Sequence, residues 1–232
     1  MKEEFEREAM LLGEEAINKL NNSYVALFGL GGVGSYTAEA LARSGVGKIL
    51  LVDNDKVSKS NINRQLCALQ STVGMYKVDV VEKRLLDINP DIIIEKAYDF
   101  VLPENISSFD FKNFDYVIDA VDTVSAKLAI AESAKQHNVP TISCMGTGNK
   151  LDPTALTVTD ISKTTMCPLA RVMRRELKKR GIHHLKVVFS TEEPKPILKA
   201  ENGKTPPASV AFVPSVGGLI AASEAIKDLI SK

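Results

Sequence analysis

The sequence predicts an α/β protein with a Rossmann-like, doubly wound and mostly parallel sheet. Short apolar segments alternate with amphipathic or alanine-rich segments along residues 1–148, and the connections between them are short. A glycine-rich turn at residues 29–34 separates the first apolar segment from an alanine-rich one. This alternation is typical of βαβ units, which place parallel strands in one sheet with helices on both faces.

Each element of this core follows from a local pattern. Helices are expected where apolar side chains recur near a 3.6-residue period or alanine is abundant, at residues 3–20, 33–43, 77–87 and 125–137. Buried strands are expected at the short apolar runs 24–28 and 48–53. Further strands are expected at 116–119 and 140–144, and another is expected to start at 92–94.

The pattern changes after Gly148, and residues 149–232 are expected to form a C-terminal extension of the same domain, which spans 1–232. Alternating apolar and polar residues predict an antiparallel strand at 155–160. A basic helix is expected at 164–180, another strand at 186–190 and a closing helix at 216–230. Residues 191–208 contain four prolines and a glycine, which predicts a mobile loop.

Composition limits the classes of function. The 232 residues hold 29 basic and 29 acidic side chains, so a nucleic-acid partner would need a local basic patch. The three cysteines are odd in number and dispersed, which favours a reducing, cytoplasmic location over a disulfide framework. Because the N-terminus is heavily charged, we expect no signal peptide. Because no apolar run is long enough to span a membrane, we expect no membrane segment.

The glycine-rich turn predicts a nucleotide site. Glycines let the backbone approach a phosphate closely, and a following helix offers its N-terminal N–H groups, at positions Gly29, Gly31, Gly32 and Gly34. Asp53 ends the next strand, where a carboxylate would bind ribose hydroxyls. A tight turn without a ligand, or an NAD(P)-dependent oxidoreductase, would also fit these residues.

The polar connection after Asp53 favours a triphosphate over a dinucleotide. Asn61, Gln65 and the cations Arg64 and Lys77 are placed to bind phosphates. Asp122, after the fourth strand, is placed to hold Mg²⁺ on them. Two alternatives stay open: Arg64 could form a salt bridge with Asp53 or Asp55, and Asp122 could be a helix N-cap.

These motifs resemble the adenylation core shared by ThiF, MoeB and the ubiquitin-activating enzymes, over roughly residues 7–144. The matching motifs are Gly29-x-Gly31-Gly32-x-Gly34, Asp53-x-Asp55-x-Val57-x-x-Ser60-Asn61-x-x-Arg64-Gln65, Gly74-x-x-Lys77 and Asp119-x-x-Asp122. The resemblance implies an ATP site that includes Asp53 and Asp55, with Asp122 on Mg²⁺ and the other matched polar side chains on the phosphates. It also implies a homodimer, because an arginine at the position of Arg7, six residues before Gly13, reaches into the neighbouring subunit's site in this family.

The second half is similar to the TcdA branch of that family. Asp152-Pro153-Thr154, residues 158–164, Cys167-Pro168-Leu169 and residues 188–192 carry this likeness. It implies a tRNA threonylcarbamoyladenosine dehydratase, which activates the threonyl carboxylate with ATP and lets the adenylate cyclise. Further candidates that it implies are a monovalent cation (K⁺ or Na⁺) and a cysteine-desulfurase or sulfur-acceptor partner.

A basic stripe independently favours tRNA. It has the spacing i, i+3, i+4 and i+7 on the predicted basic helix and consists of Arg171, Arg174, Arg175 and Lys178. Such a concentration of charge in a neutral chain suits a phosphate backbone. A solvated helix face is the alternative.

Three other functions stay open. Activation of a ubiquitin-like or sulfur-carrier protein is disfavoured because the chain lacks the two CxxC pairs of ThiF and MoeB. Cys167 lies near the region of the catalytic cysteine of ubiquitin-type activators, but we expect a half-buried thiol there, and Cys144 is expected in the core. An NAD(P) oxidoreductase is disfavoured by the polar 61–65 segment, and a non-enzymatic scaffold by the full set of charged residues.

Overall fold

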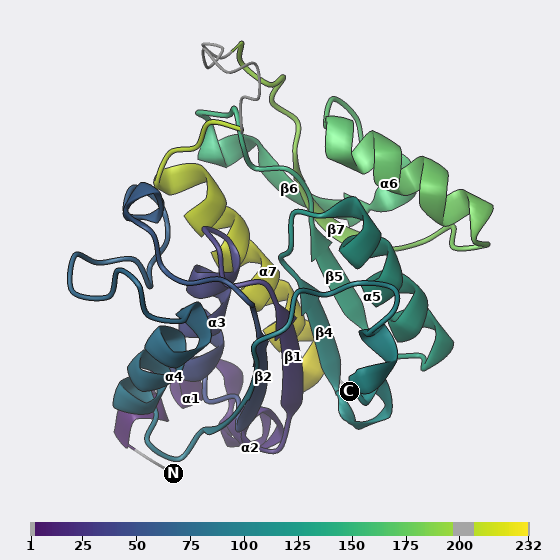
Figure 1. Ribbon diagram of the computed structural model, residues 1–232. Coiled ribbons are helices and arrows are strands. Elements are labelled where there is room, and N and C mark those ends of the chain that lie inside the picture. The colour runs from purple at the N-terminus through teal and green to yellow at the C-terminus, as the bar shows by residue number, and fades with distance from the viewer. Residues whose placement is uncertain (1–2, 197–206, 232) are drawn as a thin grey trace.

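The computed structural model describes residues 3–196 and 207–231, and its centre is a seven-stranded sheet (Figure 1). The strands are β1 (Tyr24–Phe28), β2 (Lys48–Val52), β3 (Ile93–Ala97), β4 (Tyr116–Asp119), β5 (Thr141–Cys144), β6 (Leu156–Asp160) and β7 (Lys186–Ser190). Their order across the sheet is β3-β2-β1-β4-β5-β7-β6. All neighbours are parallel except β6 and β7, which are antiparallel. The predicted fold class is therefore confirmed.

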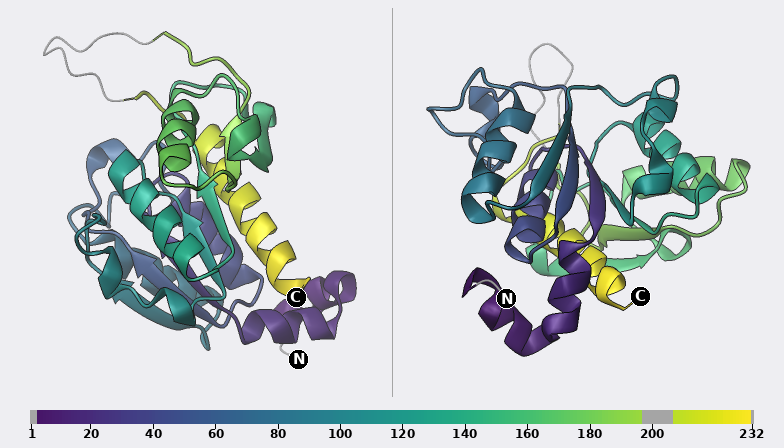
Figure 2. Two further views of the ribbon diagram at one scale, coloured as in Figure 1. Left: turned by 90° about the vertical axis from the view of Figure 1, so that its right-hand side faces the viewer. Right: turned by 90° about the horizontal axis from the view of Figure 1, so that it is seen from below.

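Helices cover both faces of the sheet. The helices are α1 (Glu6–Leu12), α2 (Glu14–Asn21), α3 (Gly34–Arg43), α4 (Lys77–Ile88), α5 (Val124–Gln136), α6 (Pro168–Lys179) and α7 (Phe212–Ile230). Helices α3, α4 and α7 share one apolar cluster with the sheet, and α5 and α6 cover the other face (Figure 1). Helices α1 and α2 form a hairpin that projects from one end of the body (Figure 2).

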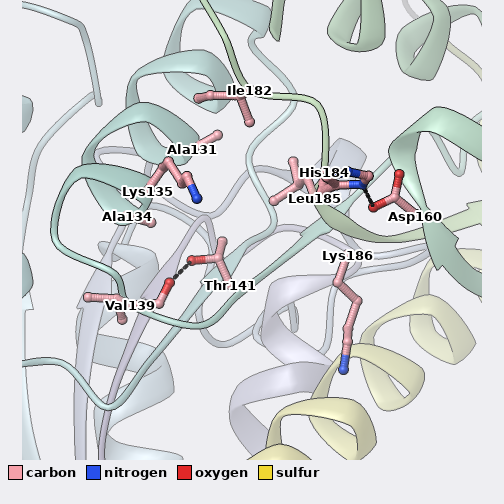
Figure 3. A pocket seen from close by; sticks show the side chains of 10 residues that line it. All are labelled: Ala131, Ala134, Lys135, Val139, Thr141, Asp160, Ile182, His184, Leu185 and Lys186. Atoms are coloured by element: carbon pink, nitrogen blue, oxygen red, sulfur yellow. Dashed lines mark hydrogen bonds and ion pairs between the residues drawn. The ribbon is translucent and has the colours of Figure 1, made fainter. Parts of the chain in front are cut away.

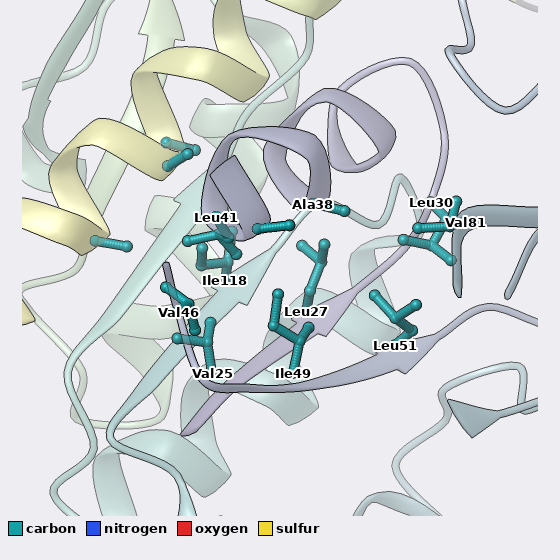
Figure 4. Packing of buried hydrophobic residues seen from close by; sticks show 14 of the residues in the cluster. Val25, Leu27, Leu30, Ala38, Leu41, Val46, Ile49, Leu51, Val81 and Ile118 are labelled. Carbon is teal, nitrogen blue, oxygen red and sulfur yellow. The ribbon is translucent and has the colours of Figure 1, made fainter. Parts of the chain in front are cut away.

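The core follows from the alternation of side chains along the strands. Val25 and Leu27 of β1 point towards α3 and α7, together with Ile49 and Leu51 of β2 (Figure 4). Ala26 and Phe28 point to the opposite face, where Phe28 packs against Phe111 and Phe109. Because both faces are buried, these strands appear in the sequence as continuous apolar runs.

The observed boundaries differ from the expected ones at three helices. The helix expected over 3–20 is divided at Gly13, whose φ of 89° is a conformation that non-glycine residues rarely adopt. Helix α6 begins at Pro168 because residues 161–163 form a separate 3₁₀ turn and Met166 has a φ of 47°. Helix α7 begins at Phe212, and Pro214 is tolerated in its first turn, where no intrahelical N–H bond is lost.

Most of the loop predicted over 191–208 lies outside the described residues. Its two described flanks are held by Asn149, whose carbonyl accepts the N–H of Lys195 and whose side-chain oxygen accepts that of Ala208. Within the described ranges, no helix is long and apolar enough to cross a membrane.

Candidate nucleotide-binding site

The turn between β1 and α3 leaves no room for side chains at two of its glycines. Gly29 has a φ of 90°, and a Cβ on it would lie 2.8 Å from the carbonyl oxygen of Ala120. A Cβ on Gly34 would lie 1.8 Å from the carbonyl oxygen of Gly29. No side chain caps the N-terminus of α3. The N–H of Ser35 in the first turn donates to the carbonyl of Gly31 at 3.1 Å, and the other first N–H groups of α3 could bind an anionic ligand beside this turn.

Asp53 follows β2 and is fixed next to the glycine turn. Its Oδ2 accepts the N–H of Leu30 at 2.7 Å, and its Oδ1 accepts the N–H of Asp55 at 2.8 Å. Burial raises the pKa of this carboxyl, while the charge of Lys77 and the two N–H donors oppose the rise. The carboxylate keeps further lone pairs, which could accept bonds from ribose hydroxyls.

Lys77, and not Arg64, is the partner of the aspartates. Its Nζ lies 2.7 Å from Asp55 Oδ2 and 3.7 Å from Asp53 Oδ1, and the residue is only 4% exposed. The N-terminal position of Lys77 on α4 brings its charge to the same edge of the sheet as the glycine turn.

Arg64 is held by neutral oxygens. Its Nη1 donates to the carbonyl of Ser60 and to Oδ1 of Asn63, both at 2.8 Å. Its Cγ would be 3.5 Å from a Cβ on Gly32, so the side chain lies against the glycine turn. No carboxylate of the described residues forms an ion pair with it. The salt-bridge alternative for Arg64 is therefore wrong, and its charge is not neutralised by an aspartate.

Two amides complete this edge. Gln65 is buried, and its Nε2 would lie 3.8 Å from a Cβ on Gly31. Asn61 uses its Oδ1 to accept the N–H of Ser58 at 3.0 Å, in a capping box of the 3₁₀ turn Lys59–Asn61. Because that oxygen is occupied, Asn61 has its Nδ2 donor to offer a phosphate.

Asp122 is exposed at the C-terminal end of β4. Its Oδ1 lies 3.4 Å from the hydroxyl of Thr123, and Thr123, not Asp122, is the N-cap residue of α5. The N-cap alternative is therefore wrong. One open carboxylate beside a candidate phosphate site would suit Mg²⁺, which binds oxygen ligands from one or two carboxylates and from phosphates. Among the described residues no group of His, Cys, Asp and Glu could hold a metal by itself.

Arg7 lies far from this edge within its own chain. It is exposed on α1, and the α1–α2 hairpin leads into the start of β1, whereas the glycine turn follows the end of that strand (Figure 1). The structure therefore does not bring Arg7 together with the other predicted site residues of the same chain.

The four residues of the basic stripe differ in their contacts. Arg174 Nη1 donates to the carbonyl and hydroxyl oxygens of Thr164, at 2.8 and 2.6 Å. Arg175 Nε lies 3.0 Å from Glu176, a carboxyl whose pKa Lys179 and Arg175 together lower to about 2. Arg171 and Lys178 are exposed. The stripe is therefore partly neutralised, and Arg174 ties α6 to the preceding turn.

Three polar side chains near the site were not predicted from the sequence. Ser35 Oγ donates to the carbonyl of Gly31 at 2.7 Å and accepts the N–H of Leu66 at 3.1 Å, so it joins the glycine turn to the 61–66 segment. Lys127 and Ser143 both contact Asp119 at the end of β4. The available signal was a lysine inside an otherwise apolar stretch of α5.

The cysteines lie in packed surroundings. Cys67, Cys144 and Cys167 are all free and buried, so Cys167 is more enclosed than expected. Burial raises the pKa of the Cys67 thiol to about 11 and that of Cys144 to about 12.

A separate cavity of about 210 Å³ lies between α5 and the start of β7 (Figure 3). His184 on its wall contacts Asp160 at 3.2 Å, and Lys186 points away towards Asp228 of α7 (Figure 3). None of the predicted nucleotide-site residues lines it. Its position at the starts of β5 and β7 places it at the edge of the sheet opposite the glycine turn.

Comparison with known protein families identifies the family of this chain. A model of the ThiF family matches residues 5–232. The chain belongs to the ThiF family. A ThiF-family relative from Bacillus subtilis (strain 168), named tRNA threonylcarbamoyladenosine dehydratase, is 45% identical over 243 residues, which cover 99% of this chain and 96% of the relative.

Solved ThiF-family structures agree with that relationship. The structure of Escherichia coli TcdA, described as a tRNA N6-threonylcarbamoyladenosine dehydratase in complex with ATP, aligns with a TM-score of 0.90 at 35% identity. The alignment covers 98% of this chain and 94% of that chain. An adenylyltransferase and sulfurtransferase UBA4 from Vanderwaltozyma polyspora is 36% identical over 60% of this chain but only 31% of its own length. The resemblance to the TcdA branch is thus confirmed.

Proposed function

We propose that this chain is an ATP-dependent tRNA threonylcarbamoyladenosine dehydratase of the cytoplasm. The relatives of this chain and the geometry of its candidate site both support this proposal. The relatives that match it over nearly their whole length carry that name. The observation that carries the proposal is the convergence of the glycine turn, the Asp53–Lys77 pair, Arg64 and Asp122 at one edge of the sheet. Open α/β sheets bind their ligands at this edge.

In the proposed complex, ATP lies across the ends of β1, β2 and β4. The backbone of the glycine turn and the N-terminus of α3 bind its phosphates, and Asp53 accepts hydrogen bonds from the ribose. Arg64, Lys77, Asn61 and Gln65 donate to the phosphates. Asp122 would hold Mg²⁺, which when bound neutralises part of the phosphate charge.

The reaction would then proceed in two displacements. An oxygen of the threonyl carboxylate attacks the α-phosphorus of ATP, the bond to the bridging oxygen breaks, and pyrophosphate leaves. Arg64 and Lys77 stabilise the negative charge that develops on the α-phosphate oxygens. A nucleophile of the same modified base then attacks the activated carbonyl, a ring closes, and AMP leaves with the carboxylate oxygen. The ring closure is intramolecular, so proximity favours it over hydrolysis and no enzyme nucleophile is required.

The proposal is tested by measuring pyrophosphate release from ATP with and without tRNA that carries threonylcarbamoyladenosine. We expect release that depends on this tRNA and a product nucleoside lighter by one water in mass analysis. Release without that dependence, or no release, would contradict it.

A second candidate is adenylation of the C-terminus of a ubiquitin-like or sulfur-carrier protein. It is favoured by the likeness to UBA4, which is confined to part of both chains. ATP–pyrophosphate exchange that requires such a carrier protein, and not tRNA, would support this candidate instead.

We also propose that a homodimer completes the site through Arg7. Helix α1 exposes the apolar side chains of Met10 and Leu11 to 84% and 85%, on the same short helix as Arg7, and a partner subunit would cover them. Mixing inactive Arg7→Ala and Arg64→Ala proteins should restore activity, because each mixed dimer contains one site with both arginines. After random exchange of subunits we expect about a quarter of the unaltered activity, since half of the dimers are mixed and half of their sites are intact. No recovery after confirmed exchange would show that Arg7 does not act across the dimer.

Two residues of the basic stripe, Arg171 and Lys178, are exposed, and we expect these two to bind tRNA. Arg174 and Arg175 already contact Thr164 and Glu176. Replacing Arg171 and Lys178 with alanine should raise the KM for tRNA and reduce the salt dependence of tRNA binding by about two in slope, since each removed cation lowers it by about one. The KM for ATP should not change. The matched control replaces Lys83 and Lys112, two exposed lysines on other elements. An equal effect in the control would show that α6 has no special role.

A further inference from the structure

Helix α5 buries a charged pair against the end of β4. Lys127 is 0% exposed and Asp119 is 1% exposed, and Lys127 Nζ lies 3.0 and 3.1 Å from the two oxygens of the Asp119 carboxylate. Its neighbours on the buried side of α5 are Ala126, Leu128, Ile130 and Ala131. Removing two charges from water is costly, and apolar side chains of similar size could hold α5 to the sheet without that cost.

The pair also joins two strands that end at the nucleotide edge. Lys127 Nζ donates to the carbonyl of Cys144, the last residue of β5, at 2.7 Å. Ser143 of the same strand donates its Oγ proton to Asp119 Oδ2 at 2.5 Å. No buried side-chain nitrogen or oxygen of this cluster lacks a hydrogen-bond partner, and apolar side chains could not form these bonds.

The same cluster fixes the segment that carries Asp122. Asp119 Oδ1 accepts the N–H of Val121, the residue before Asp122, at 3.2 Å. Between Asp119 and Val121, the backbone of Ala120 passes close to the glycine turn. A Cβ added to Gly29 would lie 2.8 Å from the carbonyl oxygen of Ala120. Lys127 orients the Asp119 carboxylate, that carboxylate orients residue 121, and the segment is pressed against the glycine turn.

We infer that Lys127 is a positioning residue that sets the place of the Asp122 carboxylate relative to the glycine turn, and hence to the metal on the ATP phosphates. This inference rests on the proposed role of Asp122 in binding Mg²⁺. Side chains that hold a metal ligand in place typically change metal affinity about 10- to 100-fold when they are replaced. Lys127 itself need not touch ATP.

The test measures ATP affinity by calorimetry with and without Mg²⁺, using the full chain. Lys127→Met alone leaves a buried, uncompensated carboxylate and is expected to fold poorly. Asp119→Asn combined with Lys127→Met removes both charges and keeps the side-chain sizes. The matched control is Tyr116→Phe, which removes a buried hydroxyl that donates to Asp228 at the opposite end of the same strand.

In the double variant we expect ATP affinity without Mg²⁺ to stay within about twofold, and the gain in affinity on adding Mg²⁺ to fall about tenfold or more. Tyr116→Phe should lower the melting temperature and keep the full Mg²⁺ gain. A double variant that melts earlier yet keeps this gain would show that Lys127 is merely structural, and would overturn the inference.

Asp122→Ala separates this failure from failure of the proposed function. If Asp122→Ala loses the Mg²⁺ gain and the double variant keeps it, only the positioning role is wrong. If Asp122→Ala keeps the gain, the proposed metal role of Asp122 is wrong, and the inference about Lys127 is overturned with it.

Discussion

Replacing Arg64 with alanine is expected to lower tRNA-dependent pyrophosphate release about 10²- to 10³-fold, as is typical when one donor to a developing negative charge is removed. The guanidinium is fixed beside the glycine turn by two neutral oxygens, and no aspartate competes for its charge. It is therefore preorganised for phosphate. The rate at saturating ATP and tRNA should fall, because the lost interaction strengthens in the transition state.

The fold should survive this change. Arg64 lies on a surface segment, and among the described residues its side chain donates to Ser60 and Asn63; both bonds are exposed, so water can take the place of the lost donor. Arg43→Ala is the control, since Arg43 is an exposed arginine that pairs with Glu39 on α3. Turnover near the unaltered level in Arg64→Ala, with the control unchanged, would remove Arg64 from the proposed mechanism.

Gly34→Ala is expected to damage both the fold and nucleotide binding. The added Cβ would lie 1.8 Å from the carbonyl oxygen of Gly29 and 3.3 Å from the Cβ of Ala120. The first of these atoms belongs to the backbone of the glycine turn, so no side-chain rotation can relieve the clash. Overpacking of this kind typically costs about 1–3 kcal/mol and sometimes more. Chemical denaturation should show lower stability, and ATP binding should be lost as α3 moves away from the turn.

Gly31→Ala is the matched comparison within the same turn. Its Cβ would meet only Gln65 Nε2, at an ordinary distance of 3.8 Å. Its stability should therefore stay near that of the unaltered protein, while ATP affinity falls because the methyl group occupies the space a phosphate needs. Equal losses of stability in the two variants would show that any side chain added to this turn destabilises the protein. The close contact between Gly29 and Gly34 would then not be the specific cause.

Much of the fold could be predicted from local sequence. A strand buried on both faces must be apolar throughout, so β1, β2 and β4 are visible as short runs, and the glycine turn marks the start of α3. The boundaries that failed depend on single residues whose conformation the pattern does not reveal. Gly13 divides a continuous helical pattern, and Pro214 lies inside a helix because it falls in the first turn.

The candidate site could be predicted as a set of residues but not as a set of contacts. Asp53 and Asp122 follow strand ends, Lys77 begins a helix, and Arg64 lies in the connection between β2 and α4. Parallel strands bring such positions to one edge of the sheet. Whether Arg64 or Lys77 pairs with the aspartates is a matter of side-chain reach, which spacing does not determine. In the structure, Lys77 forms ion pairs with Asp53 and Asp55, and Arg64 donates hydrogen bonds to neutral oxygens.

The sequence by itself therefore determined the parallel α/β architecture, the position of the glycine turn and the family resemblance, because these depend on periodicity and on short contiguous motifs. Only the tertiary structure decided the partners of the charged groups. Lys127 meets Asp119 and Cys144 across two strands, and Arg174 turns back to Thr164 instead of facing solvent. Such contacts form when segments distant in the chain pack together, and burial then requires every polar group to find a partner.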